Sequence, residues 1–163
     1  MHLVPLFQSI QCNLLLFDYS GYGKSGGKPS QSQLYHDVSS VLHYSQEIFQ
    51  YPLHRIILYG ESIGCPVAAY AATIYQVPNL ILQSGPASIL QYCYHKFPAW
   101  IYCFLYPMVF RDFPTSSYLN SYSGRCLIIH GNNDSLIPVH HAEILHQTKK
   151  NVIVSSTLKH LKD

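Results

Sequence analysis

The stretch "RIILYGESIGCPVAAYAA", from Arg55 to Ala72, has the pattern of a strand, a tight turn and a helix. Its first six residues form an apolar run typical of a buried strand. The alanine-rich second half, with Pro66 near its start, favours a helix, because proline suits a first turn and alanine suits a helix interior. The turn between them reads Gly60-Glu61-Ser62-Ile63-Gly64, which is the pattern G-x-S-x-G.

A serine on such a strand-to-helix turn is suited to nucleophilic catalysis. The sharp turn strains the backbone and exposes the hydroxyl, and the flanking glycines let neighbouring elements pack closely. The N-terminus of the following helix directs its dipole and the Ile63 N–H towards the place where a tetrahedral oxyanion forms. The motif therefore predicts Ser62 as a nucleophile and Ile63 as an oxyanion-hole donor.

The rest of the chain alternates predicted strands with predicted helices. Apolar runs predict strands over residues 13–17, 55–60, 79–85, 126–131 and 151–156, and periodicity or composition predicts helices over 32–49, 66–76 and 140–150. Strands of this kind form a parallel sheet covered by helices on both faces, with right-handed crossovers. The predicted fold class is α/β.

A serine nucleophile needs a histidine base and a carboxylate that orients the histidine, and in this fold the acid precedes the histidine along the chain. Asp134 follows the predicted strand 126–131, where ligand sites of open parallel sheets lie, so we expect it to be the acid. The alternative role is an Asx turn that closes its own loop.

His160 is the expected base, because it follows the predicted strand 151–156 at the same edge as Ser62 and Asp134. The alternative is a surface histidine of a frayed terminus. His140, His141 and His146 fall on a predicted helix that leads away from this edge. The first two are expected to be solvated or capping residues rather than metal ligands, because no cysteine or acid completes a zinc set. No metal is predicted.

A second glycine pattern, in "FDYSGYGKSGGKPS", raises the possibility of nucleotide binding. Gly21, Gly23 and Gly26 spell G-x-G-x-x-G after an apolar run. In a dinucleotide fold the last glycine opens a helix, but here Pro29 pushes Lys28 into an extended conformation, and the helix is expected to begin near Ser30 or Ser32. No nucleotide is therefore expected.

About forty residues, 86–125, separate two of the predicted strands and are rich in tyrosine, phenylalanine and proline. A long insertion at the end of a sheet strand often covers a site, so this segment is interpreted as a lid, with 86–113 supplying an apolar wall for an acyl chain. A pair of packed connecting helices is the alternative.

Composition narrows the class of protein. The chain has 163 residues, 48% hydrophobic and 11% charged, which indicates one globular domain. A net charge of +2 without a basic stripe argues against nucleic acid as a partner. The five scattered cysteines suggest a reducing, cytoplasmic setting, and the N-terminus lacks the pattern of a secretory signal.

Four segments resemble a known family: "FDYSGYGKSGGKPSQSQLYHDV", "RIILYGESIG", "FPTSSYLNSYSGRCLIIHGNND" and "LKH". They are similar to the α/β-hydrolase domain-containing group that includes the type 17 protein depalmitoylases and the Bem46-like serine hydrolases. The resemblance implies an α/β-hydrolase fold with Ser62, Asp134 and His160 as the triad and no cofactor. It also implies long-chain acyl thioesters or esters as substrates, on an acylated protein or a lipid, with peripheral membrane contact.

The same resemblance implies that the glycine loop lies beside the active site, with Tyr19, Ser20, Gly21 and Tyr22 as substrate-binding residues. The family has further strands before this chain begins, including a loop that supplies a second oxyanion donor, so residues 1–163 are expected to be one partial, N-terminally truncated hydrolase domain. The family's final helix and its membrane-targeting cysteine cluster have no counterpart in this sequence. A non-catalytic remnant that acts as a binding or regulatory module is therefore the alternative to a serine hydrolase.

Overall fold

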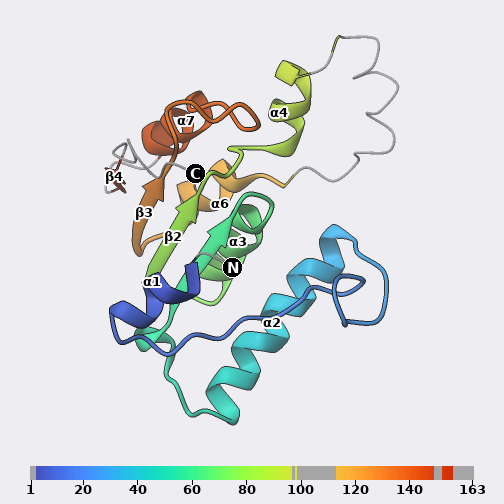
Figure 1. Cartoon of the computed structure of the whole chain (residues 1–163), viewed down its shortest axis with the longest axis vertical. Helices are drawn as coiled ribbons and strands as arrows, with labels where there is room; N and C mark the ends of the chain where they lie inside the picture. Colours follow the sequence, from blue (N-terminus) through green and yellow to red (C-terminus); the bar gives the residue numbers. More distant parts are fainter. Residues whose placement is uncertain (1–2, 97, 99–112, 149–151, 156–163) are drawn as a thin grey trace.

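The computed structural model describes residues 3–96, 98, 113–148 and 152–155. Its centre is a sheet of four parallel strands in the order β1-β2-β3-β4 (Figure 1). The strands are β1 (Ile57–Glu61), β2 (Asn79–Gln83), β3 (Arg125–Ile129) and β4 (Val152–Ser155). The sheet confirms the predicted α/β class, because each crossover between its parallel strands contains at least one helix.

Three long predicted helices are present, with shifted ends. The described helices are α1 (Leu3–Ser9), α2 (Gln31–Glu47), α3 (Gly64–Ile74), α4 (Ile89–Lys96), α6 (Thr115–Ser121) and α7 (His140–Thr148), with a 3-10 turn over Leu53–Arg55. The α2 helix begins where the sequence predicts, because Ser30 is its N-cap and the Ser30 hydroxyl accepts a hydrogen bond from the Gln33 N–H at 3.1 Å.

The main core lies between one face of the sheet and the helices α3, α6 and α7. Leu80 and Leu82 of β2 alternate with half-buried neighbours and pack with Cys126 and Ile128 of β3. A second cluster joins α2 to α3 through Leu34, Val38, Leu42, Val67, Ala71 and Val77. On the opposite face of the sheet, the ring of Tyr59 meets Phe7 of α1 edge-to-face at 5.3 Å.

The predicted strand over residues 13–17 is wrong: this segment is irregular in the structure. Its four apolar side chains, Leu14, Leu15, Leu16 and Phe17, are 39–53% exposed. A strand needs a neighbouring backbone for its N–H and C=O groups, and among the described residues β1 pairs with β2 alone. Figure 1 shows the segment passing in front of the molecule towards α2 rather than joining the sheet.

The insertion 86–125 contains the described helices α4 and α6, and its role as a lid stays a prediction. The α6 helix packs on α3 as a connecting helix, with the Thr73 hydroxyl donating to the Tyr118 carbonyl at 3.1 Å. The α4 helix lies beside the carboxyl ends of the strands (Figure 1). Residues 97 and 99–112, which carry much of the predicted apolar wall, are outside the described residues.

None of the described helices combines the length and apolar character needed to cross a bilayer.

Candidate active site

Ser62 occupies a strained turn at the carboxyl end of β1. Its φ is +52°, in the left-handed region that a residue with a side chain rarely adopts. The turn is fixed on both sides: the Ser62 N–H donates to the Gln83 carbonyl at 3.0 Å, and the Ser62 carbonyl accepts from the Cys65 N–H at 3.0 Å. The helix α3 begins two residues later, at Gly64. This is the backbone conformation that the G-x-S-x-G pattern predicts. Backbone strain of this kind is common at functional sites.

Two glycines make this turn possible by leaving room for α3. A Cβ atom added to Gly60 would lie 2.6 Å from the Gly64 carbonyl oxygen, and one added to Gly85 would lie 2.2 Å from the Cys65 sulfur. The second glycine of the motif is less crowded, because a Cβ on Gly64 would meet only the Tyr19 hydroxyl, at 3.8 Å. The close packing therefore depends on Gly60 and on Gly85, which lies outside the motif.

Cys65 lies under the turn as a buried thiol. Its sulfur is 3.2 Å from the Gly60 carbonyl oxygen and 3.3 Å from that of Gln83. Burial raises the pKa of the Cys65 thiol well above its ordinary value. Because the thiolate is the reactive form, this buried thiol is a poor nucleophile.

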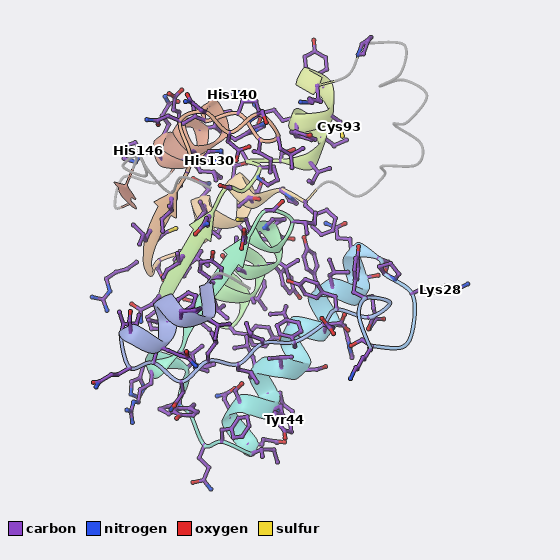
Figure 2. The ribbon with its side chains drawn as sticks, in the orientation of Figure 1. Lys28, Tyr44, Cys93, His130, His140 and His146 are labelled. Atoms are coloured by element: carbon purple, nitrogen blue, oxygen red, sulfur yellow. The ribbon has the colours of Figure 1, made fainter. Side chains whose placement is uncertain are left out.

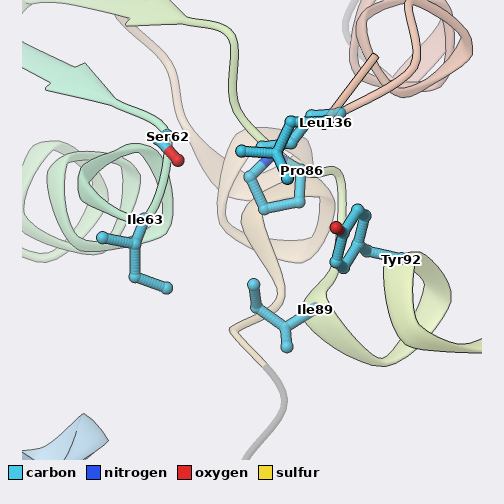
Figure 3. Close-up of a pocket in the computed structure, with 7 residues that line it drawn as sticks. Ser62, Ile63, Pro86, Ile89, Tyr92 and Leu136 are labelled. Atoms are coloured by element: carbon cyan, nitrogen blue, oxygen red, sulfur yellow. The ribbon is translucent and has the colours of Figure 1, made fainter. Parts of the chain in front are cut away.

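A small pocket of about 140 Å³ opens beside Ser62 (Figure 3). Its lining comes from three places in the chain: the turn after β1, the segment from β2 into α4, and the loop after β3. The lining residues are Ser62, Ile63, Pro86, Ile89, Tyr92, Leu136 and Ile137. An apolar pocket beside a serine hydroxyl, at the carboxyl edge of a parallel sheet, can hold an apolar group next to that hydroxyl.

The Ile63 N–H lies at the N-terminal end of α3, for which Ile63 is the N-cap. The N–H groups of a helix N-terminus have no acceptor within their own helix and favour negative charge. Ile63 also lines the pocket beside Ser62. This position is compatible with the predicted oxyanion-hole role.

Asp134 lies in the loop after β3 and closes a turn. Its Oδ1 atom accepts hydrogen bonds from the N–H groups of Leu136 and Ile137, both at 2.9 Å. This is the Asx-type turn that the sequence leaves open as the alternative role. The turn uses one carboxylate oxygen and sets the pocket residues Leu136 and Ile137 in place, so Oδ2 is the oxygen that a histidine can approach.

A buried histidine, His130, stands next to that second oxygen. Its Nε2 atom is 2.7 Å from the Ile137 carbonyl oxygen and 3.8 Å from Asp134 Oδ2. Because a carbonyl oxygen can only accept, Nε2 carries the hydrogen, and 3.8 Å is too long for a second hydrogen bond. His130 therefore holds the loop after β3 through Ile137 rather than pairing with Asp134.

The expected base, His160, lies outside the described residues. The nearest described element before it is β4, which pairs in parallel with β3 and ends at Ser155. The role of His160 stays a prediction.

The glycine loop is held against α2 by one carboxylate. Asp37 accepts from the Ser20 N–H and the Ser20 hydroxyl, both at 2.8 Å, and from the Gln33 side chain at 2.9 Å. The Tyr19 side chain is half-buried. Burial, with smaller contributions from the nearby Cys65 and Asp37, raises the pKa of Tyr19 to about 12.

The four expected substrate-binding residues of this loop differ in their surroundings. The Tyr19 hydroxyl lies near Gly64, as noted above, whereas Ser20 is fixed by Asp37. Gly21 has a φ of +82° and no room for a Cβ, which would meet Pro29 at 2.5 Å, and Tyr22 is 55% exposed. The pocket lining includes none of the four, so their binding role stays a prediction.

One histidine of α7, His141, differs from the expectation of a solvated side chain. His141 is fully buried rather than solvated, and its Nδ1 atom accepts from the Ala87 N–H at 3.4 Å. The sequence shows its helix but not that this face of the helix turns inward. Figure 2 shows His130, His140 and His146 around α7 and the end of β3. The described residues include no group of three or more potential metal ligands placed to hold an ion.

A profile of the family described as "alpha/beta hydrolase fold" matches residues 1–108. The chain belongs to the α/β hydrolase family. Alpha/beta hydrolase domain-containing protein 17C of Xenopus tropicalis is 33% identical over 144 residues, which cover 88% of this chain and 44% of that protein. The human protein of the same name is 31% identical over 144 residues, 88% of this chain and 42% of its own length. The chain thus spans less than half the length of these relatives.

Solved structures agree on the fold. An alpha-beta hydrolase from Vibrio vulnificus matches with a TM-score of 0.72 and 24% identity, over 86% of this chain and 54% of that one. An esterase from Pyrococcus furiosus matches with a TM-score of 0.66 and 22% identity, over 95% of this chain and 64% of that one. The family and the fold expected from the sequence are therefore confirmed.

Sequence reasoning missed part of the site. Leu136 and Ile137 lie two and three residues after Asp134, and that proximity is a signal that could have found them. Pro86, Ile89 and Tyr92 fall within the segment expected to supply an apolar wall, but the sequence does not single them out.

Proposed function

We propose that this α/β hydrolase is a serine hydrolase that cleaves acyl esters or thioesters through Ser62, Asp134 and His160. The observation that carries the proposal is Ser62 itself: a serine with a left-handed backbone, between a strand and a helix, beside an apolar pocket. A backbone strained in this way persists only where the surrounding structure determines it, and such strain concentrates at functional sites.

In the proposed reaction, Ser62 Oγ attacks the acyl carbonyl carbon while His160 takes the hydroxyl proton. The Ile63 N–H stabilises the oxyanion of the tetrahedral intermediate. Collapse of this intermediate breaks the bond to the leaving alcohol or thiol, which takes the proton from His160. Water then attacks the acyl-enzyme with His160 as base and releases the acid and free Ser62.

Asp134 orients His160 in this proposal. Its Oδ1 atom is held by two backbone N–H groups, so the carboxylate has a fixed direction, and Oδ2, 3.8 Å from His130 Nε2, is the oxygen that would accept from the His160 imidazole.

Long-chain acyl thioesters or esters, on a protein or a lipid, are the proposed substrate class. The proposal rests on the resemblance of the four sequence segments and is supported by the apolar lining of the pocket. The proposal includes a cytoplasmic location, which the scattered cysteines favour, and contact with a membrane surface, where acylated proteins and lipids are held.

Two serine variants test the proposed function. Ser62→Ala is expected to lower the turnover of a p-nitrophenyl acyl ester by at least roughly 10³-fold, because the nucleophile is lost. Ser84→Ala is the matched control: Ser84 also has a left-handed backbone at the end of a strand, with φ of +48°, but it does not line the pocket. Equal turnover by wild type and Ser62→Ala would overturn the proposal.

A further inference from the structure

The pocket beside Ser62 has two side-chain hydroxyls and is otherwise apolar. Of its seven lining residues, only Ser62 and Tyr92 have polar side chains. Figure 3 shows the Tyr92 hydroxyl directed into the pocket, across from Ser62 and next to Pro86. Tyr92 therefore forms a wall of the space that an acyl group on Ser62 would enter.

The helix that carries Tyr92 is anchored at its start. The Ala87 N–H donates to the buried His141, and the Ala87 carbonyl accepts from the Ser116 N–H of α6 at 3.0 Å. The Ser88 hydroxyl accepts from the Gln91 N–H at 3.2 Å and caps the first turn. The start of α4 is thus tied to both α6 and α7.

The end of α4 is anchored to the opposite wall of the pocket. The Lys96 ammonium donates to the Ser135 carbonyl at 3.2 Å, in the loop that also carries Leu136 and Ile137. The Tyr92 ring also lies against the His141 ring, with centroids 6.1 Å apart. Because the start of α4 is tied to α6 and α7 and the Tyr92 ring packs on His141, Tyr92 has a set position in the wall of the pocket.

The pocket is small for the proposed substrates. Its volume of about 140 Å³ is close to that of a cavity of about 150 Å³ that binds benzene. It therefore has room for roughly the first six carbons of an acyl chain. The remaining carbons of a longer chain would lie beyond Tyr92 and Ile89.

We propose that Tyr92 is a specificity-determining residue that limits how many carbons of the acyl chain the Ser62 pocket buries. The inference rests on the proposed serine hydrolase and deepens it. Selectivity then depends on the carbons near the carbonyl: kcat/KM rises from acetyl to about hexanoyl esters, by roughly fourfold for each methylene buried, and changes little with longer chains.

Three tyrosine variants test this with p-nitrophenyl esters from acetyl to dodecanoyl. Tyr92→Ala opens the wall, so the ratio of kcat/KM for decanoyl over butanoyl esters is expected to rise by at least roughly tenfold, the effect of burying about two further methylene groups. Tyr92→Phe keeps the ring and the wild-type profile. Tyr94→Ala is the matched control, because Tyr94 lies on the same helix, is 64% exposed and does not line the pocket.

A binding measurement separates failure of this inference from failure of the proposed function. Straight-chain alcohols from ethanol to decanol are titrated into each variant and followed by NMR, which needs no turnover. The inference is supported, even if wild type hydrolyses nothing, when Tyr92→Ala binds the longer alcohols more tightly than wild type does and the other two variants do not. If wild type hydrolyses the esters, an unchanged ester profile in a folded Tyr92→Ala variant overturns the inference. Unchanged alcohol binding in that variant overturns it whether or not Ser62 reacts.

Discussion

Gly60 shows at the scale of a single residue how the turn around Ser62 is built. The first residues of α3 fold back over it, so that a Cβ would lie 2.6 Å from the Gly64 oxygen and 2.8 Å from the Cys65 Cα atom. Both neighbours are backbone atoms, which cannot rotate away as a side chain could. Any side chain at this position must therefore displace the start of α3 and, with it, Ser62 and Ile63.

Gly60→Ala is accordingly expected to lower the free energy of unfolding by about 1–3 kcal/mol, because the added methyl overpacks the turn. The variant should also react more slowly at Ser62. Gly26→Ala is the matched control, since a Cβ at Gly26 meets nothing within 4 Å, and its stability should stay within about 0.5 kcal/mol of wild type. Urea denaturation of both variants checks this. Equal stability of the two would contradict the described turn.

At the scale of elements, Asp37 joins the glycine loop to α2. Burial by itself would raise the pKa of the Asp37 carboxyl. Hydrogen bonds from the Ser20 N–H, the Gln33 side chain and the Ser20 hydroxyl outweigh this effect, so the pKa of Asp37 lies below its ordinary value. A carboxyl whose pKa is lowered by folding stabilises the protein above its unfolded pKa of about 3.9. This contribution is lost as the pH falls through the folded pKa.

Asp37→Asn should therefore destabilise the protein by about 1–2 kcal/mol near neutral pH, and the difference from wild type should shrink as the pH falls below about 4. Urea unfolding across this pH range measures both effects. Glu47→Gln is the control on the same helix, because Glu47 pairs with His43 at an exposed site where an ion pair contributes little. A stability difference for Asp37→Asn that grows with acidification has the wrong sign for this account.

The helices and strands that can be predicted well are those whose signals, such as a cap, an apolar spacing or a turn motif, lie within one short stretch of sequence. The Ser30 cap and the spacing of Leu34, Val38 and Leu42 predict α2, and the G-x-S-x-G turn predicts the junction of β1 and α3. The error at residues 13–17 has a physical cause: an apolar run shows that a segment could be a strand, but its partner is set by distant parts of the chain.

At the scale of the whole molecule, the sheet brings the site together from separate stretches of sequence. Ser62 follows β1, Pro86 follows β2, and Asp134 and Leu136 follow β3, so parallel pairing sets them all at one edge. Sequence order and fold class predict that edge, which is why the positions of Ser62 and Asp134 in the fold follow from the sequence, whereas their catalytic roles stay predictions. The inward orientation of Tyr92 and His141 could not, because it depends on how α4 and α7 pack.

The central claim is that the chain folds so that His160 activates Ser62. Fluorophosphonate labelling of the purified chain, followed by intact mass and peptide mapping, tests it most directly, with Ser62→Ala, His160→Ala and Ser84→Ala alongside. The account predicts a single adduct on Ser62 that forms equally in Ser84→Ala and is lost in His160→Ala. A cooperatively folded chain that gains no adduct, or one whose Ser62 labelling is independent of His160, would contradict it.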